Sequence, residues 1–202
     1  DIVFTSEYTR ISTLLKQLQK QKIDILAEVD EAVYMFKERA LSEGKHLLYD
    51  EPETMPPVYG DRNRLKQVFI NVLDNALKYT AEGGMVGVQV YQDYKDEMIK
   101  IIVADNGIGI KKEDMNRLFK EFERIDEVRT RNIQGSGLGM SITIRLLNMM
   151  NSELKVKSEY GVGSTFSFEI PQKVMNETEV VHTKEEVVEK FTAPADLHSF
   201  RI

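Results

Sequence analysis

Apolar residues recur at three- and four-residue steps over residues 65–76, which is the spacing of an amphipathic helix. Asp61 stands just before this stretch and is a favourable N-cap residue. At 100° per residue, Asn71, Asn75 and Lys78 fall within an arc of about 60° beside the apolar stripe. The pattern therefore predicts a helix that packs one face on a core and presents two amides and an ammonium group at its edge.

The same periodicity predicts further helices, and alternation of apolar and polar residues predicts strands. A proline-rich connector is expected over residues 51–60, and residues 95–97 are expected to form the turn of a hairpin. A polar, helix-prone stretch leads into residues 118–124. The predicted helices cover residues 27–42 and 140–150, and the predicted strands cover residues 46–50, 85–94, 98–104, 153–158 and 164–171.

The beginning of the chain carries a different pattern. Phe4, Tyr8, Ile11, Leu15 and Leu18 step by four and three residues, as the apolar positions of a coiled coil do. This seam lasts about two heptads, which is shorter than most coiled coils. We interpret it as the end of a helix that pairs elsewhere, and a core helix of the same domain is the alternative.

Composition narrows the classes of function. The chain has 202 residues, enough for one ample core, and its 33 acidic against 27 basic residues argue against a nucleic-acid-binding protein. It has no cysteine and three histidines, which excludes a thiolate metal site and disfavours a histidine metal cluster. It contains neither a long apolar run nor a signal peptide, so we expect a soluble, intracellular piece. Because it begins at Asp1, we expect it to be part of a longer protein.

The polar edge of the central helix suits a metal-bound phosphate. An amide oxygen such as that of Asn75 is a hard neutral ligand for Mg²⁺, which draws its other ligands from phosphate and water. Lys78 adds a positive charge for phosphate oxygens. An ordinary solvated helix face is the alternative. The glycine clusters further along the chain favour the phosphate site over this alternative.

The first glycine cluster follows the second predicted strand of the hairpin and reads Asp105-Asn106-Gly107-Ile108-Gly109-Ile110. Its glycines allow the backbone to come close to a flat ligand. The Asp105 carboxylate can accept a hydrogen bond from the exocyclic amine of adenine, and it would repel the oxygen that guanine carries there. A simple turn is the alternative for this cluster alone.

The second cluster, Gly135-Ser136-Gly137-Leu138-Gly139, opens a predicted helix after a charged stretch that suits a mobile flap. Backbone N–H groups at such a helix start bind phosphate. The cluster matches neither the P-loop nor the dinucleotide-binding motif, and a plain flexible turn is the alternative. The last predicted hairpin contains Gly163 and Thr165, which could border the same pocket.

Together these motifs resemble the catalytic, ATP-binding domain of sensor histidine kinases, within the superfamily that includes DNA gyrase and Hsp90. Their order and spacing match over roughly residues 25–172, and five ordered motifs are more specific than any one of them. The matching segments are an N-box at 71–79, a first glycine box at 105–109, an F-box at 119–122, a second glycine box at 135–139 and a third at 161–166.

The resemblance implies an α/β fold of the Bergerat type, a two-layer sandwich in which a mixed, mostly antiparallel sheet packs on helices beneath a flexible ATP lid. It also implies ATP and Mg²⁺ as cofactors. Asn75 would hold the metal with support from Asn71, and Lys78, Tyr79 and Arg124 would meet the phosphates, with Asn75, Lys78 and Arg124 as the catalytic set. The other implied nucleotide-binding residues are Asp105, Gly107, Gly109, Ile110, Gly135, Gly137, Leu138, Gly139 and Thr165.

The resemblance also implies partners. Residues 1–24 would be the end of a dimerisation helix, residues 25–172 the catalytic domain and residues 173–202 a C-terminal linker. The partners would be the dimerisation segment that bears the phosphoacceptor histidine and the receiver domain of a response regulator, in a homodimeric sensor bound to a membrane by other parts. In the family Glu or Asp follows the acceptor histidine, and no histidine here has that neighbour, so we expect the acceptor on another segment.

Three alternatives remain open. A serine-directed kinase of the same superfamily is disfavoured by the F-box and the long lid. A degenerate domain that serves as a scaffold is disfavoured by the complete set of polar motif residues. An ATPase of the gyrase or Hsp90 kind would need a catalytic Glu shortly before the N-box asparagine, and Asn71 occupies the position four residues before Asn75.

Overall fold

Five strands form one mixed sheet in the computed structural model, which describes residues 21–118 and 139–172. The strand order is β2-β4-β5-β7-β6; β2 pairs in parallel with β4, and all other neighbours are antiparallel. Both predicted hairpins are confirmed, as β4-β5 and β6-β7. The strands are β2 (His46–Tyr49), β4 (Met85–Asp93), β5 (Met98–Asp105), β6 (Lys155–Glu159) and β7 (Gly163–Pro171).

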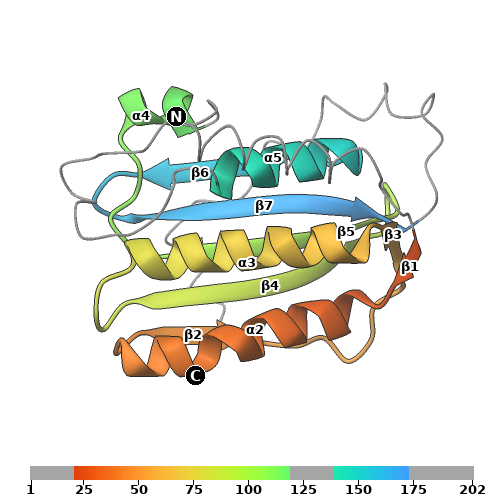
Figure 1. Ribbon diagram of the computed structural model, residues 1–202, viewed down its shortest axis with the longest axis horizontal. Helices are drawn as coiled ribbons and strands as arrows, with labels where there is room; N and C mark the ends of the chain where they lie inside the picture. Colours follow the sequence, from red (N-terminus) through yellow and green to blue (C-terminus); the bar gives the residue numbers. More distant parts are fainter. Residues whose placement is uncertain (1–20, 119–138, 173–202) are drawn as a thin grey trace, which may run out of the picture.

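Helices cover one face of this sheet, with α3 between α2 and α5 (Figure 1). The expected two-layer α/β sandwich with a mixed, mostly antiparallel sheet is thereby confirmed. Among the described residues, no helix combines the length and apolar character that crossing a bilayer requires. The helices are α2 (Ile25–Ser42), α3 (Arg62–Tyr79), α4 (Lys112–Leu118) and α5 (Gly139–Met149).

The core lies between the two layers and follows the predicted periodicities. Alternate residues of β4, namely Val86, Val88 and Val90, are buried. The six apolar residues whose spacing predicted the central helix are also buried: Leu65, Val68, Phe69, Val72, Leu73 and Ala76. The ring of Phe69 on α3 lies 5.7 Å from that of Phe168 on β7, between centroids, so this aromatic pair joins helix and sheet. The pattern of apolar residues therefore fixes which face of α3 turns inward.

Ion pairs connect α2 to α3 along their whole length. Each pair joins residues 34 or 35 positions apart in the sequence, which requires the two helices to run parallel. Parallel alignment brings the C-terminal end of α2 beside the C-terminal end of α3, where Asn75 and Tyr79 lie. The pairs are Glu28–Arg62, Glu31–Lys66 and Arg39–Asp74.

A small second sheet corrects two expectations. β1 (Gln21–Ile23) pairs antiparallel with β3 (Val58–Gly60), although residues 21–24 were expected to end a helix and residues 51–60 to form a connector. The rest of the expected helix, residues 1–20, lies outside the described residues. The Asp24 side chain caps α2 by accepting the Ala27 N–H, so the chain enters that helix from an extended conformation. Strands of three residues leave too short an alternation to be recognised in the sequence.

Replacement of Phe168 by alanine should lower the free energy of unfolding by about 3 to 5 kcal/mol, because this side chain is 1% exposed and its loss leaves a cavity against Phe69. Urea unfolding measures the change. Tyr34→Ala, at a position on α2 that is 78% exposed, is the control and should change it by less than about 0.5 kcal/mol. Equal effects of the two substitutions would contradict this placement of the core.

Candidate nucleotide-binding site

A cavity lies between the C-terminal half of α3 and the loop that follows β5, and it encloses about 480 Å³ including the part open to solvent. Five of the residues singled out from the sequence line it: Asn75, Tyr79, Asp105, Gly109 and Ile110. These residues come from separate elements that only the fold brings together. The lining also contains residues that the sequence did not single out as site residues, namely Ile108, Lys111, Asp114, Tyr160, Ser164 and Phe166.

The helix α3 supplies the first wall. Asp61 caps its N-terminus by accepting the N–H groups of Asn63 and Arg64, and the helix ends at Tyr79. Asn75 and Tyr79, four residues apart, lie one above the other on the same face of the helix. The Tyr79 carbonyl accepts the N–H of Ile108 at 3.1 Å, so the end of α3 is hydrogen-bonded to the loop that forms the opposite wall.

Asp105 is a buried carboxylate at the end of β5, with 3% of its surface exposed. Its Oδ1 accepts the N–H of Gly107 at 2.9 Å, and the backbone N–H of Ser164 also donates to the carboxylate. Burial raises the pKa of Asp105 to about 6, although these two hydrogen bonds lower it. The carboxylate is therefore poised to accept a further donor, such as an aromatic amine, that enters the cavity.

Gly107 is required by a close approach of backbone segments. A Cβ atom at this position would lie 2.2 Å from the Tyr79 carbonyl oxygen and 2.9 Å from Oδ1 of Asp105. The loop therefore reaches α3 and its own carboxylate only because no side chain stands here. This explains why the sequence reads Asp105-Asn106-Gly107, and it supports the expected role of Gly107 in shaping the pocket without placing the residue on the cavity lining.

Ser164 takes the place at the cavity that the sequence suggested for Thr165. Side chains alternate along a strand, so Ser164 and Phe166 point to the cavity side of β7 while Thr165 pairs with Ala104 on the other side. The Ser164 hydroxyl lies 2.8 Å from that of Ser158. The sequence carries a signal for this orientation: Phe166, Phe168 and Ile170 alternate with polar residues, so Phe166, and with it Ser164, belongs to the apolar side of the strand.

Asn71 and Lys78 do not line the cavity, although the sequence placed them beside Asn75. The Asn71 amide donates to the Thr143 hydroxyl of α5 at 3.2 Å, so it joins two helices. The Lys78 ammonium forms an ion pair with Asp74 at 2.8 Å. The shared helix edge predicted from the sequence is present, but each of these two polar groups has a partner of its own.

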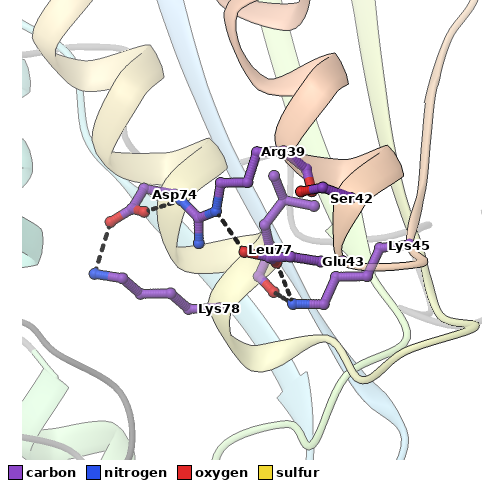
Figure 2. A network of polar contacts seen from close by, with 7 residues as sticks. All are labelled: Arg39, Ser42, Glu43, Lys45, Asp74, Leu77 and Lys78. Carbon is purple, nitrogen blue, oxygen red and sulfur yellow. Dashed lines mark hydrogen bonds and ion pairs between the residues drawn. The ribbon is translucent and has the colours of Figure 1, made fainter.

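Figure 2 shows that the Lys78–Asp74 pair belongs to a polar network between α2 and α3. Arg39 Nη1 binds Asp74 at 2.6 Å, and Arg39 Nε binds Glu43 at 2.9 Å. Burial would raise the pKa of Asp74, but the hydrogen bonds from Lys78 and Arg39 outweigh burial and hold it below its ordinary value. Asp74 is therefore a carboxylate shared by two cations, one from each helix.

The network closes on the last turn of α3. Glu43 Oε2 binds the Lys45 ammonium at 2.7 Å, and that ammonium donates to the Leu77 carbonyl, also at 2.7 Å (Figure 2). A cation at the C-terminal end of a helix stabilises carbonyls that have no partner within the helix. Residues just after α2 therefore hold the end of α3 that faces the cavity.

Four of the remaining predicted residues lie outside the part of the chain that the structure describes. Arg124, Gly135, Gly137 and Leu138 belong to residues 119–138, and so does the F-box. Gly139 is the last residue of the second glycine cluster and the first residue of α5, so the cluster opens this helix, as the sequence predicted, one residue before the predicted start at 140.

A family model described as histidine kinase-, DNA gyrase B-, and HSP90-like ATPase matches residues 60–174, which is more than half of the chain. The chain belongs to this ATPase family. Its similarity to individual proteins points within the family to histidine kinases. Hybrid signal transduction histidine kinase B of Dictyostelium discoideum is 39% identical over 176 residues, which cover 85% of this chain and 9% of that protein.

The adaptive-response sensory kinase SasA of Thermosynechococcus vestitus is 33% identical over 155 residues, which cover 77% of this chain and 40% of that protein. The chain thus spans less than half the length of these relatives. Among solved structures, full-length ShkA in complex with AMPPNP has a TM-score of 0.66 and 28% identity, covering 77% of this chain and 31% of that one. The sequence resemblance to the ATP-binding domain of histidine kinases is confirmed.

The substitution Asp105→Asn should raise stability at neutral pH. The folded-state pKa of Asp105, about 6, lies above the ordinary value of 3.8, so ionisation favours the unfolded chain. Relative to the variant, the native chain should lose about 2 kcal/mol as pH rises from 4 to 6, and the loss should level off near pH 7, above the folded-state pKa. Urea unfolding of both proteins from pH 4 to pH 7 measures the difference; parallel pH profiles would contradict the burial of an ionisable carboxyl here.

Arg39 and Asp74 should show a coupling free energy of about 1 kcal/mol in a double-mutant cycle of Arg39→Met and Asp74→Asn, because the pair is half-buried and part of a network. The more exposed pair Glu31–Lys66 is the matched control between the same two helices, and its cycle of Glu31→Gln and Lys66→Met should give less than about 0.5 kcal/mol. Equal coupling in the two cycles, measured by urea unfolding, would show that the network adds nothing.

Proposed function

We propose that this chain is the ATP-binding catalytic domain of a two-component sensor histidine kinase. In this role it transfers the γ-phosphate of ATP to a histidine on a separate dimerisation segment. The observation that carries the proposal is that Asp105, at the end of a strand, and Asn75, on a helix, line the same cavity. Two groups suited to opposite ends of a nucleotide, a base and a metal-bound phosphate, are thus available to one ligand.

Asp105 would recognise the base. In its ionised form the carboxylate accepts a hydrogen bond from the exocyclic amine of adenine and repels the oxygen of guanine. Its other hydrogen bonds come from backbone N–H groups, which fix its orientation without neutralising its charge. Ile110 and Phe166 supply apolar surface beside it for the flat ring.

Asn75 would hold Mg²⁺ through its amide oxygen. Residues 21–118 and 139–172 contain no group of three or more His, Cys, Asp and Glu residues that could hold a metal ion. A single amide oxygen from Asn75 is compatible with Mg²⁺, because this ion binds through one or two protein oxygens and takes its other ligands from phosphate and water. When bound, the ion would screen the negative charge of the phosphates.

The cations would complete the phosphate end. We infer that Lys78 moves from Asp74 to the phosphates when ATP binds, and that Arg39 then keeps the Asp74 carboxylate compensated. Asn71 would support the metal end from the same helix edge. Arg124 and the backbone of residues 135–139 would act from the lid. Phosphoryl transfer asks a protein mainly for such positioning and charge neutralisation.

The partners of the whole protein would be the dimerisation segment with its histidine and the receiver domain of a response regulator. The relatives are named a hybrid signal transduction histidine kinase and an adaptive-response sensory kinase, and these names support a role in signalling. The full-length protein would be a homodimeric sensor. Other segments would anchor it in a membrane, and this domain would lie in the cytoplasm.

Asn75→Asp should lower transfer of phosphate from Mg·ATP by about 10- to 100-fold, because a negative charge replaces a neutral amide where the metal and the phosphates meet. Titration of a fluorescent ATP analogue with and without Mg²⁺ measures binding, and transfer to a separately supplied dimerisation segment measures catalysis. Asn63→Asp makes the same chemical change at the exposed start of α3 and should leave both unchanged. Wild-type affinity and transfer in Asn75→Asp would overturn the metal role of this residue.

A further inference from the structure

The cavity has a wall that none of the sequence motifs indicated. Lys111 follows the first glycine cluster, and Tyr160 follows β6; both line the cavity. The Lys111 ammonium lies 5.3 Å from the centroid of the Tyr160 ring, within the range of a cation–π interaction. Two residues that are distant in the sequence therefore meet at the wall of the cavity.

The backbone beneath Tyr160 is fixed to the same loop that carries the cavity lining. The N–H of Gly161 donates to the Ile108 carbonyl at 2.6 Å. Gly109 packs directly on the turn, because a Cβ atom there would lie 2.1 Å from the Glu159 carbonyl oxygen and 2.9 Å from the Tyr160 Cα. The backbone that carries the ring is thus held in position, while 36% of the residue's surface is exposed.

We propose that Tyr160 contacts the base of the bound nucleotide and that Lys111 is a positioning residue for its ring. The inference rests on the proposed function, since it takes the ligand of this cavity to be ATP. Asp105 marks the base end, and Tyr160 lines the same cavity from the turn between β6 and β7. An aromatic ring stacks on any base, so Tyr160 supplies affinity while Asp105 supplies the choice of adenine.

The substitution Tyr160→Ala should weaken the binding of ATP and of ADP by the same factor, about 5- to 100-fold, because the loss is confined to the base. Tyr160→Phe keeps the stacking surface and should bind both nucleotides as the native chain does. Lys111→Met should cause a smaller loss than Tyr160→Ala. Tyr94→Ala is the matched control, because this tyrosine follows β4, lies outside the cavity lining and is 81% exposed.

Isothermal titration with ATP and ADP measures these affinities. Competition by inorganic tripolyphosphate, which has no base, measures binding at the phosphate end alone, and this binding would change only if the substitution disturbed the whole site. An equal loss for ATP and ADP with unchanged tripolyphosphate binding supports the proposal. Unchanged nucleotide affinity in Tyr160→Ala, or an equal loss for tripolyphosphate, overturns it. If instead the native chain binds no adenine nucleotide, the proposed function itself fails.

Discussion

The close approach of the loop after β5 to the end of α3 is the constraint on which the site depends. The Tyr79 carbonyl accepts the Ile108 N–H, and the absence of a side chain at Gly107 lets the two segments meet. The same loop returns an N–H to the Asp105 carboxylate. Sheet and helix layers are thereby joined at one edge by backbone contacts, and the cavity lies where they meet.

This arrangement explains how a buried carboxylate, Asp105, can remain available to bind a ligand. Asp105 is stabilised by backbone N–H groups rather than by a cation, so its charge stays available to a ligand, and burial holds its pKa near 6. Asp74 is the opposite case, because two cations share it and lower its pKa. One carboxylate is thus suited to recognition and the other to holding helices and a lysine in place.

The amphipathic pattern predicted α3, its inward face and the residues at its edge, because helical periodicity depends only on local geometry. The edge alone did not separate Asn75, which lines the cavity, from Asn71 and Lys78, which bind Thr143 and Asp74. Thr143 lies on α5, and Asp74, although it lies on α3, is also bound by Arg39 of α2. A single sequence does not show these contacts between helices. Tyr160 and Lys111 were missed for the same reason, since their proximity arises from strand pairing.

The sequence by itself determined the order of the motifs and the side chains that could meet a base, a metal and phosphates, because these follow from residue chemistry and local periodicity. The type of fold followed from the resemblance of these motifs to histidine kinases. The tertiary structure decided which of these groups share one cavity, that Ser164 rather than Thr165 faces it, and that Arg39 from α2 binds Asp74. The reason is physical: strand register and the alignment of helices bring together residues that are distant along the chain, and both depend on packing of the whole domain.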